Sequence, residues 1–377
     1  MFRFLTAGES HGKGLVAIIE GIPSGLAISE DYIAVQLKRR QGGYGRGGRM
    51  QIEQDRAEII SGVRHGLTIG SPISMLIKNR DWENWQEKMS VSPVAGEIEP
   101  VTCLRPGHAD LAGVSKYNFD DIRPILERAS ARETTARVAV GTVARRLLEE
   151  FGVEIHSHVT AIGGCWAEPT GSIDWGEVEA SPVRCADAEA EKEMIAAIDA
   201  AKEAGDSVGG TFEMIVTGVP IGLGSHIQWD RRLNGKIAQS IMSIHAIKGV
   251  EIGEGFTAAD LRGSQAHDVI EPGLRRPTNW AGGLEGGMTN GQPIVVRAAM
   301  KPIATIATPL SSIDLRTGEK ALAHFERSDT CVVPAAGVIG EAMLALVLAE
   351  ALLQKFGGDN LDETLRNYRG YINGLAI

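Results

Sequence analysis

Residues 126–141 place the tightest constraint on this chain, because they concentrate arginines among small side chains. Arg128, Arg132 and Arg137 are separated mainly by alanine, serine and threonine, which are too small to screen the guanidinium groups. Arg128 and Arg132 share a face if the segment is helical, and a helix start here would add backbone N–H groups that favour anions. Two interpretations stand about equal. The stretch is either the wall of a pocket for a multiply charged phosphate or carboxylate ligand, or a helix with surface arginines on a small-residue packing face.

Residues 39–49 form a second basic stretch, with five glycines and four arginines in eleven residues. Such a composition cannot build a packed core. It predicts either a flexible basic loop or an anion-binding flap, in which glycines bring the backbone close to a ligand and guanidiniums bind its oxygens in pairs. The stretch is not a P-loop, because that pattern is absent. It is not a dinucleotide fingerprint either, because no strand precedes it.

The overall charge argues against a nucleic-acid binder. The formal net charge of the 377-residue chain is −10, and only 5% of its residues are aromatic. A DNA or RNA binder normally has a basic excess, because neutralising phosphates drives its affinity. An acidic chain with locally dense arginines instead favours a small anionic ligand in a focused pocket.

The cysteines and the N-terminus indicate a reducing compartment. Cys103, Cys165, Cys185 and Cys331 show no C-x-x-C spacing, so neither a zinc site nor a disulfide framework is expected. The N-terminus lacks a signal-peptide pattern, and no run of 18 apolar residues occurs. We therefore expect a cytoplasmic protein with free thiols, no bound metal and no membrane span.

Periodicity and turn residues predict alternating strands and helices. Strands are expected over residues 2–7, 14–20, 58–61, 74–78, 153–162, 211–219 and 294–300, and helices over 32–40, 121–151, 187–203, 233–247 and 335–356. A break after the arginine cluster is the alternative for 121–151. Residues 81–92 are polar and predict a surface excursion. No repeat or clear linker occurs, so we predict a single domain over residues 1–377 with mixed αβ content.

Two histidines stand out. His108 follows Arg105 in a loop that Pro106 and Gly107 impose. A solvated loop histidine is the commoner outcome, but the nearby arginine favours a site. His245 falls at the end of the helix expected over 233–247. A charged histidine there would suit the helix dipole, and a structurally satisfied histidine is the safer interpretation.

Three stretches together resemble the signatures of the chorismate synthase family. They are Gly8-Glu9-Ser10-His11-Gly12, Glu127-Arg128-Ala129-Ser130-Ala131-Arg132-Glu133-Thr134 and Arg327-Ser328-Asp329-Thr330-Cys331, in the family's order and spacing. Residues 39–49, 105–108, 245–255 and 301–302 also resemble family segments, so the resemblance runs from about residue 4 to residue 349. It implies an α+β fold, a β-α-β sandwich with central helices between antiparallel sheet layers, and a homotetramer.

The resemblance also implies an FMN-dependent lyase. Chorismate synthases catalyse the 1,4-anti elimination of phosphate from 5-enolpyruvylshikimate 3-phosphate, which gives chorismate in the last common step of the shikimate pathway. Reduced FMN is required although no net oxidation occurs, and NADPH is a candidate reductant for the flavin. The substrate's two carboxylates and phosphate, together with the FMN phosphate, suit a pocket rich in arginine.

Matching positions carry the family's site residues onto this chain. The substrate would be bound by Arg40, Arg46, Arg49, Arg105 and Arg132, and NADPH by Arg40 and Arg46. FMN would contact Arg128, Ala129, Ser130, His245, Ala246, Gly286, Lys301, Pro302, Ile303, Ala304, Thr305 and Arg327. The remaining three matches are the candidate catalytic residues His11, His108 and Asp329.

The resemblance also implies roles for these groups. One histidine would protonate the leaving phosphate and the other would face the charge of the reduced flavin, and Asp329 would assist proton removal. The chain departs from the family at Ile303 and Ala304. Many members carry hydroxyl residues there, so side-chain hydroxyl contacts to FMN cannot form at these two positions.

Two other functions stay open at the level of sequence. An NADPH-dependent flavin reductase would use the same arginines and glycines, but no dinucleotide fingerprint is present. A nucleic-acid binding module would use residues 39–49 as a basic arm, and the net charge of −10 disfavours it. Salt-dependent binding to random oligonucleotide would distinguish this last function from the others.

Overall fold

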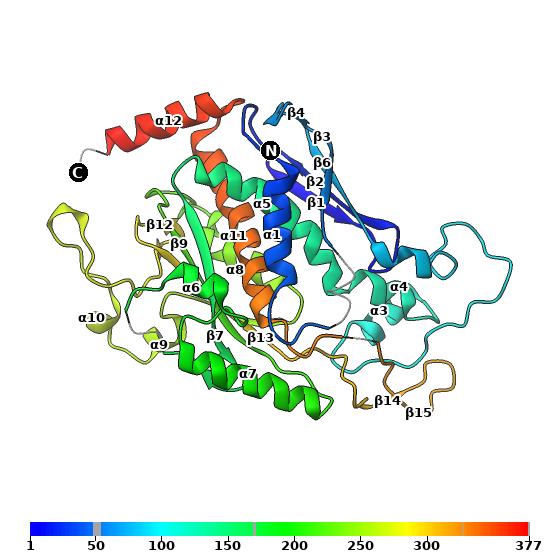
Figure 1. Ribbon diagram of the computed structural model, residues 1–377. Coiled ribbons are helices and arrows are strands. Elements are labelled where there is room, and N and C mark those ends of the chain that lie inside the picture. Colours follow the sequence, from blue (N-terminus) through cyan, green and yellow to red (C-terminus); the bar gives the residue numbers. More distant parts are fainter. Residues whose placement is uncertain (48–53, 169–170, 327, 376–377) are drawn as a thin grey trace.

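Two antiparallel sheets enclose a layer of helices. The computed structural model describes residues 1–47, 54–168, 171–326 and 328–375. The first sheet has the strand order β1-β2-β6-β3, and the second has the order β10-β13-β9-β7-β8. Figure 1 shows α5 and α11 between the two sheets. The α+β sandwich with central helices is therefore confirmed.

The two sheets are built from short, alternating strands. The first contains β1 (Arg3–Ala7), β2 (Gly14–Glu20), β3 (Ala57–Ser61) and β6 (Ile73–Lys78). The second contains β7 (Glu154–Ile162), β8 (Cys165–Trp166), β9 (Gly210–Thr217), β10 (Ile247–Ile252) and β13 (Ile294–Met300). On β2, β6, β9 and β13 every second residue is apolar and buried, as with Ala17 and Ile19 on β2 or Phe212 and Met214 on β9. One face of each sheet is thereby committed to the helical layer.

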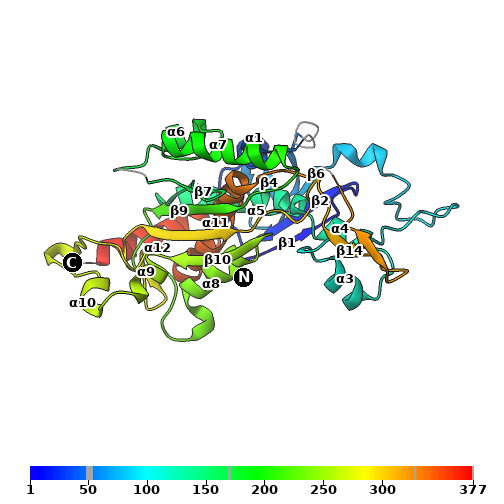
Figure 2. The same ribbon diagram turned by 90° about the horizontal axis from the view of Figure 1, so that it is seen from below.

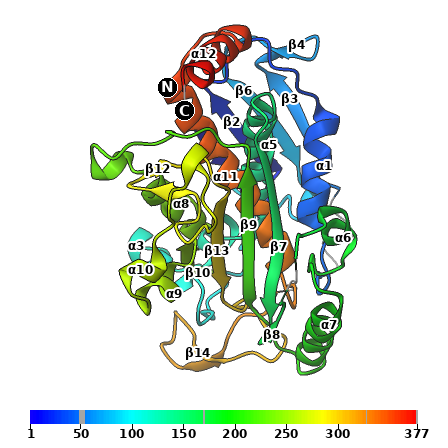
Figure 3. The ribbon, with the colours of Figure 1, turned by 90° about the vertical axis from the view of Figure 1, so that its left-hand side faces the viewer.

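Four helices fill the middle of the sandwich. They are α1 (Glu30–Gln41), α5 (Thr134–Glu149), α8 (Leu233–Met242) and α11 (Val333–Phe356). The α5 helix packs on β1 and β2, and α11 packs on β7 and β9 as well as on α5. Figure 3 shows β7, β9 and β13 in front of α11. The α11 helix is long and apolar enough to cross a membrane, but 83% of its most apolar window is buried inside the fold, as suits the core of the sandwich.

Smaller elements surround this core. At one end lie η1 (Arg80–Asn84), α3 (Asp110–Tyr117), α4 (Arg123–Arg128), β14 (Ser311–Ile313) and β15 (Lys320–Leu322). Beyond β7 lie α6 (Trp175–Ala180) and α7 (Ala188–Glu203), as Figure 2 shows. The remaining pieces are β4 (Val63–Arg64), β5 (Leu67–Thr68), η3 (Trp229–Arg231), α9 (Gly255–Ala259), α10 (Gly263–Ala266), η4 (Pro272–Leu274), β11 (Leu284–Glu285), β12 (Met288–Thr289) and α12 (Leu361–Gly374).

Two predicted helices have different bounds in the structure. The segment 121–151 is not one helix, and its break falls inside the arginine cluster, at Ala129 and Ser130, rather than after it. The helix predicted over 233–247 ends at Met242. It cannot continue, because Ala246 has a left-handed backbone with φ of 64° and Ile247 already begins β10.

Candidate active site

The break in the arginine-rich segment separates the arginines that periodicity had placed together. The α4 helix ends at Arg128, and η2 (Ala131–Glu133) leads into α5. The side chain of Arg128 is 44% exposed, whereas that of Arg132 is 3% exposed. The expectation of unscreened guanidiniums was wrong, since Arg132 pairs with Asp55 and Glu133 lies 2.8 Å from Arg137.

Arg40, at the end of α1, joins Arg132 around the same carboxylate. Arg40 is buried, and its Nε donates to Thr134 Oγ1 (2.9 Å) while Nη2 donates to the Ala131 carbonyl (2.8 Å). Its Nη1 lies 3.7 Å from Asp55 and has no hydrogen-bond partner among the described residues. Burial, reinforced by Arg46 and Arg132, lowers the pKa of Arg40 to about 9, so the group stays charged at neutral pH. A buried guanidinium with spare donor capacity suits an incoming anion.

The glycine-rich stretch meets the last of the three signatures. The Gly45 carbonyl accepts from Thr330 N (2.8 Å), Gly47 N donates to Asp329 Oδ1 (2.5 Å), and Arg46 Nε lies 3.4 Å from Asp329 Oδ2. Gly45 is required here, because its φ is 85° and a Cβ would lie 3.0 Å from Cys331 Cβ. Arg49 and Arg327 fall outside the described residues.

Arg105 and His108 lie together, as predicted, and share a carboxylate. Asp110 accepts from Arg105 Nε (2.9 Å) and lies 2.6 Å from His108 Nδ1. Burial alone would raise the pKa of Asp110, but the hydrogen bonds from His108 and Arg105 outweigh it and hold that pKa well below its usual range. Arg105 Nη1 also donates to Thr305 Oγ1 (3.2 Å), which ties this loop to the segment 301–305.

His11 lies on the loop between β1 and β2 and is 8% exposed. Its Nδ1 is 2.8 Å from Glu127 Oε1, and its ring stacks on Trp85 with centroids 4.0 Å apart. The prediction that 81–92 is only a surface excursion was therefore incomplete, because Trp85 packs against a candidate catalytic histidine. The first two signatures also meet through the hydroxyls of Ser10 and Ser130, which are 3.1 Å apart.

Some of the candidate FMN residues lie close together in the structure. The Ala246 carbonyl accepts from Lys301 N (3.0 Å), and a Cβ on Gly107 would lie 3.6 Å from Ala304 and 3.7 Å from Lys301 Nζ. Lys301, Ala304 and Thr305 thus border the Arg105 loop. Burial, with a smaller contribution from Lys248, lowers the pKa of Lys301.

Gly286 is not joined to this group by any contact among the described residues. It lies in the turn between β11 and β12, and its neighbour Gly287 accepts from Leu233 N at the start of α8. His245 follows the other end of that helix. A ten-residue helix is about 15 Å long, so the two candidate FMN residues lie far apart within one chain.

A cavity of about 400 Å³ lies beside β1 and holds two of the predicted residues. Its lining includes Thr6, Arg128, Glu133, Arg137 and His245. Burial, followed by the charges of Arg137, His108 and Arg40, lowers the pKa of His245 to about 4 despite the opposing effect of Glu133. Its Nδ1 has no hydrogen-bond partner in the described part of the chain. The expectation of a satisfied structural histidine was wrong: His245 is neutral at pH 7 and has polar capacity left for a ligand.

Sequence reasoning did not assign a role to five residues that organise this site: Asp55, Asn79, Trp85, Asp110 and Glu127. Asn79 is buried, accepts from Arg132 Nε (3.0 Å), and donates to the carbonyls of Glu9 (3.0 Å) and Gly12 (2.8 Å). Asp110 and Glu127 had a signal in the sequence, since Asp110 lies two residues after His108 and Glu127 opens the second signature. Asp55 and Asn79 had none, because their partners are distant in the sequence.

Together these contacts create one polar region with a strong capacity for anions. Four candidate arginines converge on it from three segments, and two histidines are each backed by a buried carboxylate. Fixed, desolvated cations bind oxyanions strongly and discriminate by geometry. The arrangement can therefore hold a small polyanion beside two imidazoles that can donate and accept protons.

Comparison with known proteins gives a consistent result over nearly the whole chain. The family model described as chorismate synthase matches residues 2–353. The chain is 54% identical to the chorismate synthase of Thermobifida fusca (strain YX) and 56% identical to that of Moorella thermoacetica, in each case over 100% of both chains. A crystal structure of a chorismate synthase superposes with a TM-score of 0.80 at 47% identity, covering 99% of this chain and 98% of that one.

Proposed function

The chain belongs to the chorismate synthase family, and we propose how its own residues carry out the family's reaction. It is a carbon–oxygen lyase that eliminates phosphate from 5-enolpyruvylshikimate 3-phosphate and gives chorismate, with a requirement for reduced flavin. The full-length match carries this conclusion, and the buried arginine cluster supports it independently.

The substrate is bound, in this proposal, by Arg40, Arg46, Arg105 and Arg132, together with Arg49. The first four converge around Asp55, Asp110 and Asp329. These carboxylates fix the guanidinium planes before the ligand arrives. Orientation of this kind lowers the cost of ordering side chains when a polyanion binds.

The proton transfers are assigned to His11, His108 and Asp329. One histidine protonates the phosphate as it leaves, the other faces the flavin, and Asp329 assists removal of the ring proton. Both histidines have a carboxylate within 2.8 Å of Nδ1. A carboxylate at that position keeps a proton on Nδ1 and orients the ring, which leaves Nε2 for proton transfer.

Reduced FMN would supply reversible electron donation to the substrate when it is bound at this site. The residues present fit an anionic cofactor, because His245 Nδ1 and Arg40 Nη1 have no hydrogen-bond partners among the described residues and Lys301 is a partly buried cation. We propose that FMN is held by Arg128, Ala129, Ser130, His245, Ala246, Lys301, Pro302, Ile303, Ala304, Thr305 and Arg327. Gly286 would contribute from a different part of the assembly, since it lies far from His245 within one chain.

Further properties follow from the family and are proposals for this chain. We expect a cytoplasmic homotetramer in which residues 1–377 act as one domain. One continuous hydrophobic cluster that includes residues from both sheets and the central helices supports the single domain. NADPH would reduce the flavin and would contact Arg40 and Arg46.

The deciding experiment is an anaerobic assay with 5-enolpyruvylshikimate 3-phosphate and chemically reduced FMN, following chorismate and phosphate. We expect turnover with reduced FMN and none with oxidised FMN. NADPH in place of the chemical reductant then tests the flavin-reductase activity. No turnover from folded, FMN-bound protein would contradict the assigned reaction and favour another flavin-dependent reaction on an anionic substrate.

A further inference from the structure

Glu127 holds His11 by two separate contacts. Its Oε1 lies 2.8 Å from His11 Nδ1, and its Oε2 accepts from the backbone N–H of His11 (2.6 Å). The backbone carbonyl of Glu127 accepts in turn from Ser10 N (3.2 Å). The Glu127 side chain has no exposed surface. The end of α4 is thereby fastened to the β1–β2 loop through one carboxylate.

A carboxylate at Nδ1 decides which ring nitrogen does chemistry. An ionised carboxylate only accepts hydrogen bonds, so Nδ1 must carry a proton whenever this contact is made. Nε2 is then the nitrogen that takes up and releases a proton. Arg123 compensates the buried charge, since its Nη1 lies 3.3 Å from Glu127 Oε1 and 2.6 Å from Glu326 Oε1.

Trp85 adds a second constraint on the same ring. The planes of His11 and Trp85 differ by 21° at a centroid distance of 4.0 Å. The stacked indole covers one face of the imidazole and opposes rotation about its χ2 angle. Glu127 therefore selects the nitrogen, and Trp85 holds the plane in which it lies.

His108 offers an instructive contrast. Asp110 lies 2.6 Å from its Nδ1, but Arg105 Nη2 lies 2.9 Å from the same nitrogen. Asp110 also accepts from Arg105 N, Nε and Nη2. Its carboxylate therefore serves the arginine as much as the histidine. The carboxylate contacts of Glu127 on this loop all go to His11, which makes Glu127 the clearer case of a residue acting through a histidine.

We infer that Glu127 is the positioning residue for His11 and keeps it in the form with the proton on Nδ1 and the transferable proton on Nε2. This inference rests on the proposed role of His11 as a proton donor. In the step itself, the Nε2 proton of the imidazolium passes to a phosphate oxygen as the carbon–oxygen bond breaks. The imidazole is left neutral with its Nδ1 proton in place, and Glu127 stays ionised throughout.

The test compares Glu127→Gln with Glu326→Gln in the full-length, FMN-loaded protein. Both variants remove one carboxylate from Arg123 and one nearby negative charge from His11, but only E127Q removes the carboxylate that lies 2.8 Å from His11 Nδ1. The amide of E127Q would donate to Nδ1 and oppose the imidazolium. We expect kcat to fall by about 10²-fold or more in E127Q, with the KM for 5-enolpyruvylshikimate 3-phosphate and the FMN affinity within about threefold of wild type. The fall in E326Q should be less than about one tenth as large.

A double-mutant cycle separates positioning from general damage. If Glu127 acts only through His11, adding E127Q to His11→Ala lowers kcat no further than H11A alone. The inference would be overturned if the fold-losses in kcat of E127Q and H11A multiplied in the double variant. A wild-type kcat in E127Q would overturn it as well. If H11A is as active as the wild type, the role of His11 fails and the inference fails with it, while wild-type turnover still establishes the reaction.

Nuclear magnetic resonance can determine which ring nitrogen of His11 is protonated without any measurement of turnover. Long-range ¹H–¹⁵N spectra of ¹⁵N-histidine-labelled protein report which ring nitrogen is protonated, and comparison with H11Q assigns the His11 signals. We expect a protonated Nδ1 in the wild type and an unprotonated Nδ1 in E127Q. An unprotonated Nδ1 in the wild type would overturn the inference even if E127Q failed to fold.

Discussion

At the scale of single residues, the site depends on guanidiniums that are buried before any ligand arrives. Arg40 and Arg132 share Asp55, and Arg105 is held by Asp110. Burying charges is costly unless each is paired and hydrogen-bonded. In exchange for this cost, the cations need not reorganise when a polyanion binds. Such preorganised charges stabilise an anion most effectively.

Arg40→Lys tests whether the guanidinium shape matters as well as its charge. Lysine keeps the charge but loses the fork that donates to Thr134 and Ala131. We expect kcat/KM for 5-enolpyruvylshikimate 3-phosphate to fall by about 10²-fold, mostly through KM. Steady-state kinetics measures this. Arg3→Lys, at an exposed pair with Glu20, is the matched control, and an equal response in both variants would contradict the prediction.

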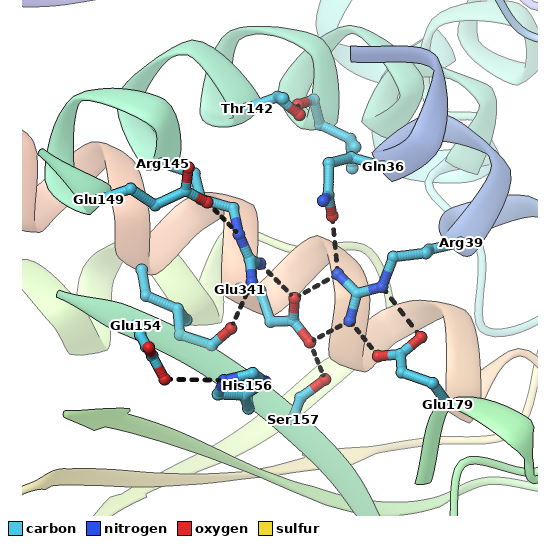
Figure 4. Close-up of polar contacts among 12 residues, drawn as sticks. Gln36, Arg39, Thr142, Arg145, Glu149, Glu154, His156, Ser157, Glu179 and Glu341 are labelled. Carbon is cyan, nitrogen blue, oxygen red and sulfur yellow. Dashed lines mark hydrogen bonds and ion pairs between the residues drawn. The ribbon is translucent and has the colours of Figure 1, made fainter. Parts of the chain in front are cut away.

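At the scale of elements, the buried Glu341 on α11 fastens four segments together. Its carboxylate forms ion pairs with Arg39 of α1 (2.6 Å), Arg145 of α5 (2.8 Å) and Arg184 (3.2 Å). It also accepts a hydrogen bond from the Ser157 hydroxyl of β7 (2.6 Å), and Figure 4 shows part of this network. Arg39 and Arg40 are consecutive in the sequence, but Arg39 pairs with Glu341 and Arg40 lies beside Asp55. One anchors α1 to the core, and the other enters the site.

Glu341→Gln should destabilise the fold, with a defined pH dependence. Burial alone would raise the pKa of Glu341, but Arg39, Arg145 and Arg184 outweigh it and lower the pKa to about 2, against 4.5 for an unperturbed glutamate. The stabilisation is therefore complete above pH 4.5 and is lost as the pH falls from 4.5 toward 2. We expect a loss of about 3–5 kcal/mol in the free energy of unfolding at pH 7.

Urea unfolding of wild type and E341Q at pH 7, 4.5 and 3 measures the free energy of unfolding of each protein. The difference between the two free energies should become smaller only below pH 4.5. Glu154→Gln is the control, because Glu154 is an exposed carboxylate (71% of its side chain) beside His156. A difference between wild type and E341Q that stays constant down to pH 3 would refute the assignment.

The contact between α5 and α11 is equally specific. A Cβ on Gly141 of α5 would lie 2.6 Å from Ala342 Cβ on α11, whereas a Cβ on Gly370 of α12 would meet no atom within 4 Å. We expect Gly141→Ala to cost about 1–3 kcal/mol of unfolding free energy by forcing the helices apart. Gly370→Ala should gain up to about 1 kcal/mol through helix propensity. Thermal unfolding of both variants checks this, and equal shifts would show that the helices can separate without cost.

At the scale of the whole molecule, an acidic protein carries a cationic site. The net charge is −10, so the surface as a whole repels polyanions while the buried arginines attract a small one. This difference separates a small-molecule enzyme from a nucleic-acid binder more firmly than any single motif.

The corresponding prediction concerns polymers. Random single-stranded oligonucleotide should not bind measurably at physiological salt, because a net negative surface offers few phosphate contacts. Fluorescence anisotropy of a labelled oligonucleotide measures this, with a basic protein of similar size as the positive control. Salt-dependent micromolar binding would revive the nucleic-acid alternative for residues 39–49.

The sequence alone determined the alternation of strands and located the segments that carry the arginines and histidines of the candidate site. The strands over 14–20 and 294–300 have the predicted bounds, because alternation of apolar residues is a local pattern that one face of a sheet requires. The signatures around His11, Arg132 and Asp329 were also visible, since each is contiguous in the chain.

Only the tertiary structure decided how those segments combine. Asp55 neutralises Arg132, Glu127 holds His11, and Trp85 stacks on it. The break at Ser130 likewise moved Arg128 and Arg132 to different environments. No periodicity encodes these contacts, because their partners lie tens of residues apart and meet only when the two sheets close on the helices. Whether a charged side chain is a surface group or a buried, oriented one depends on that closure, and this is why the chemistry of the site could not be read from spacing.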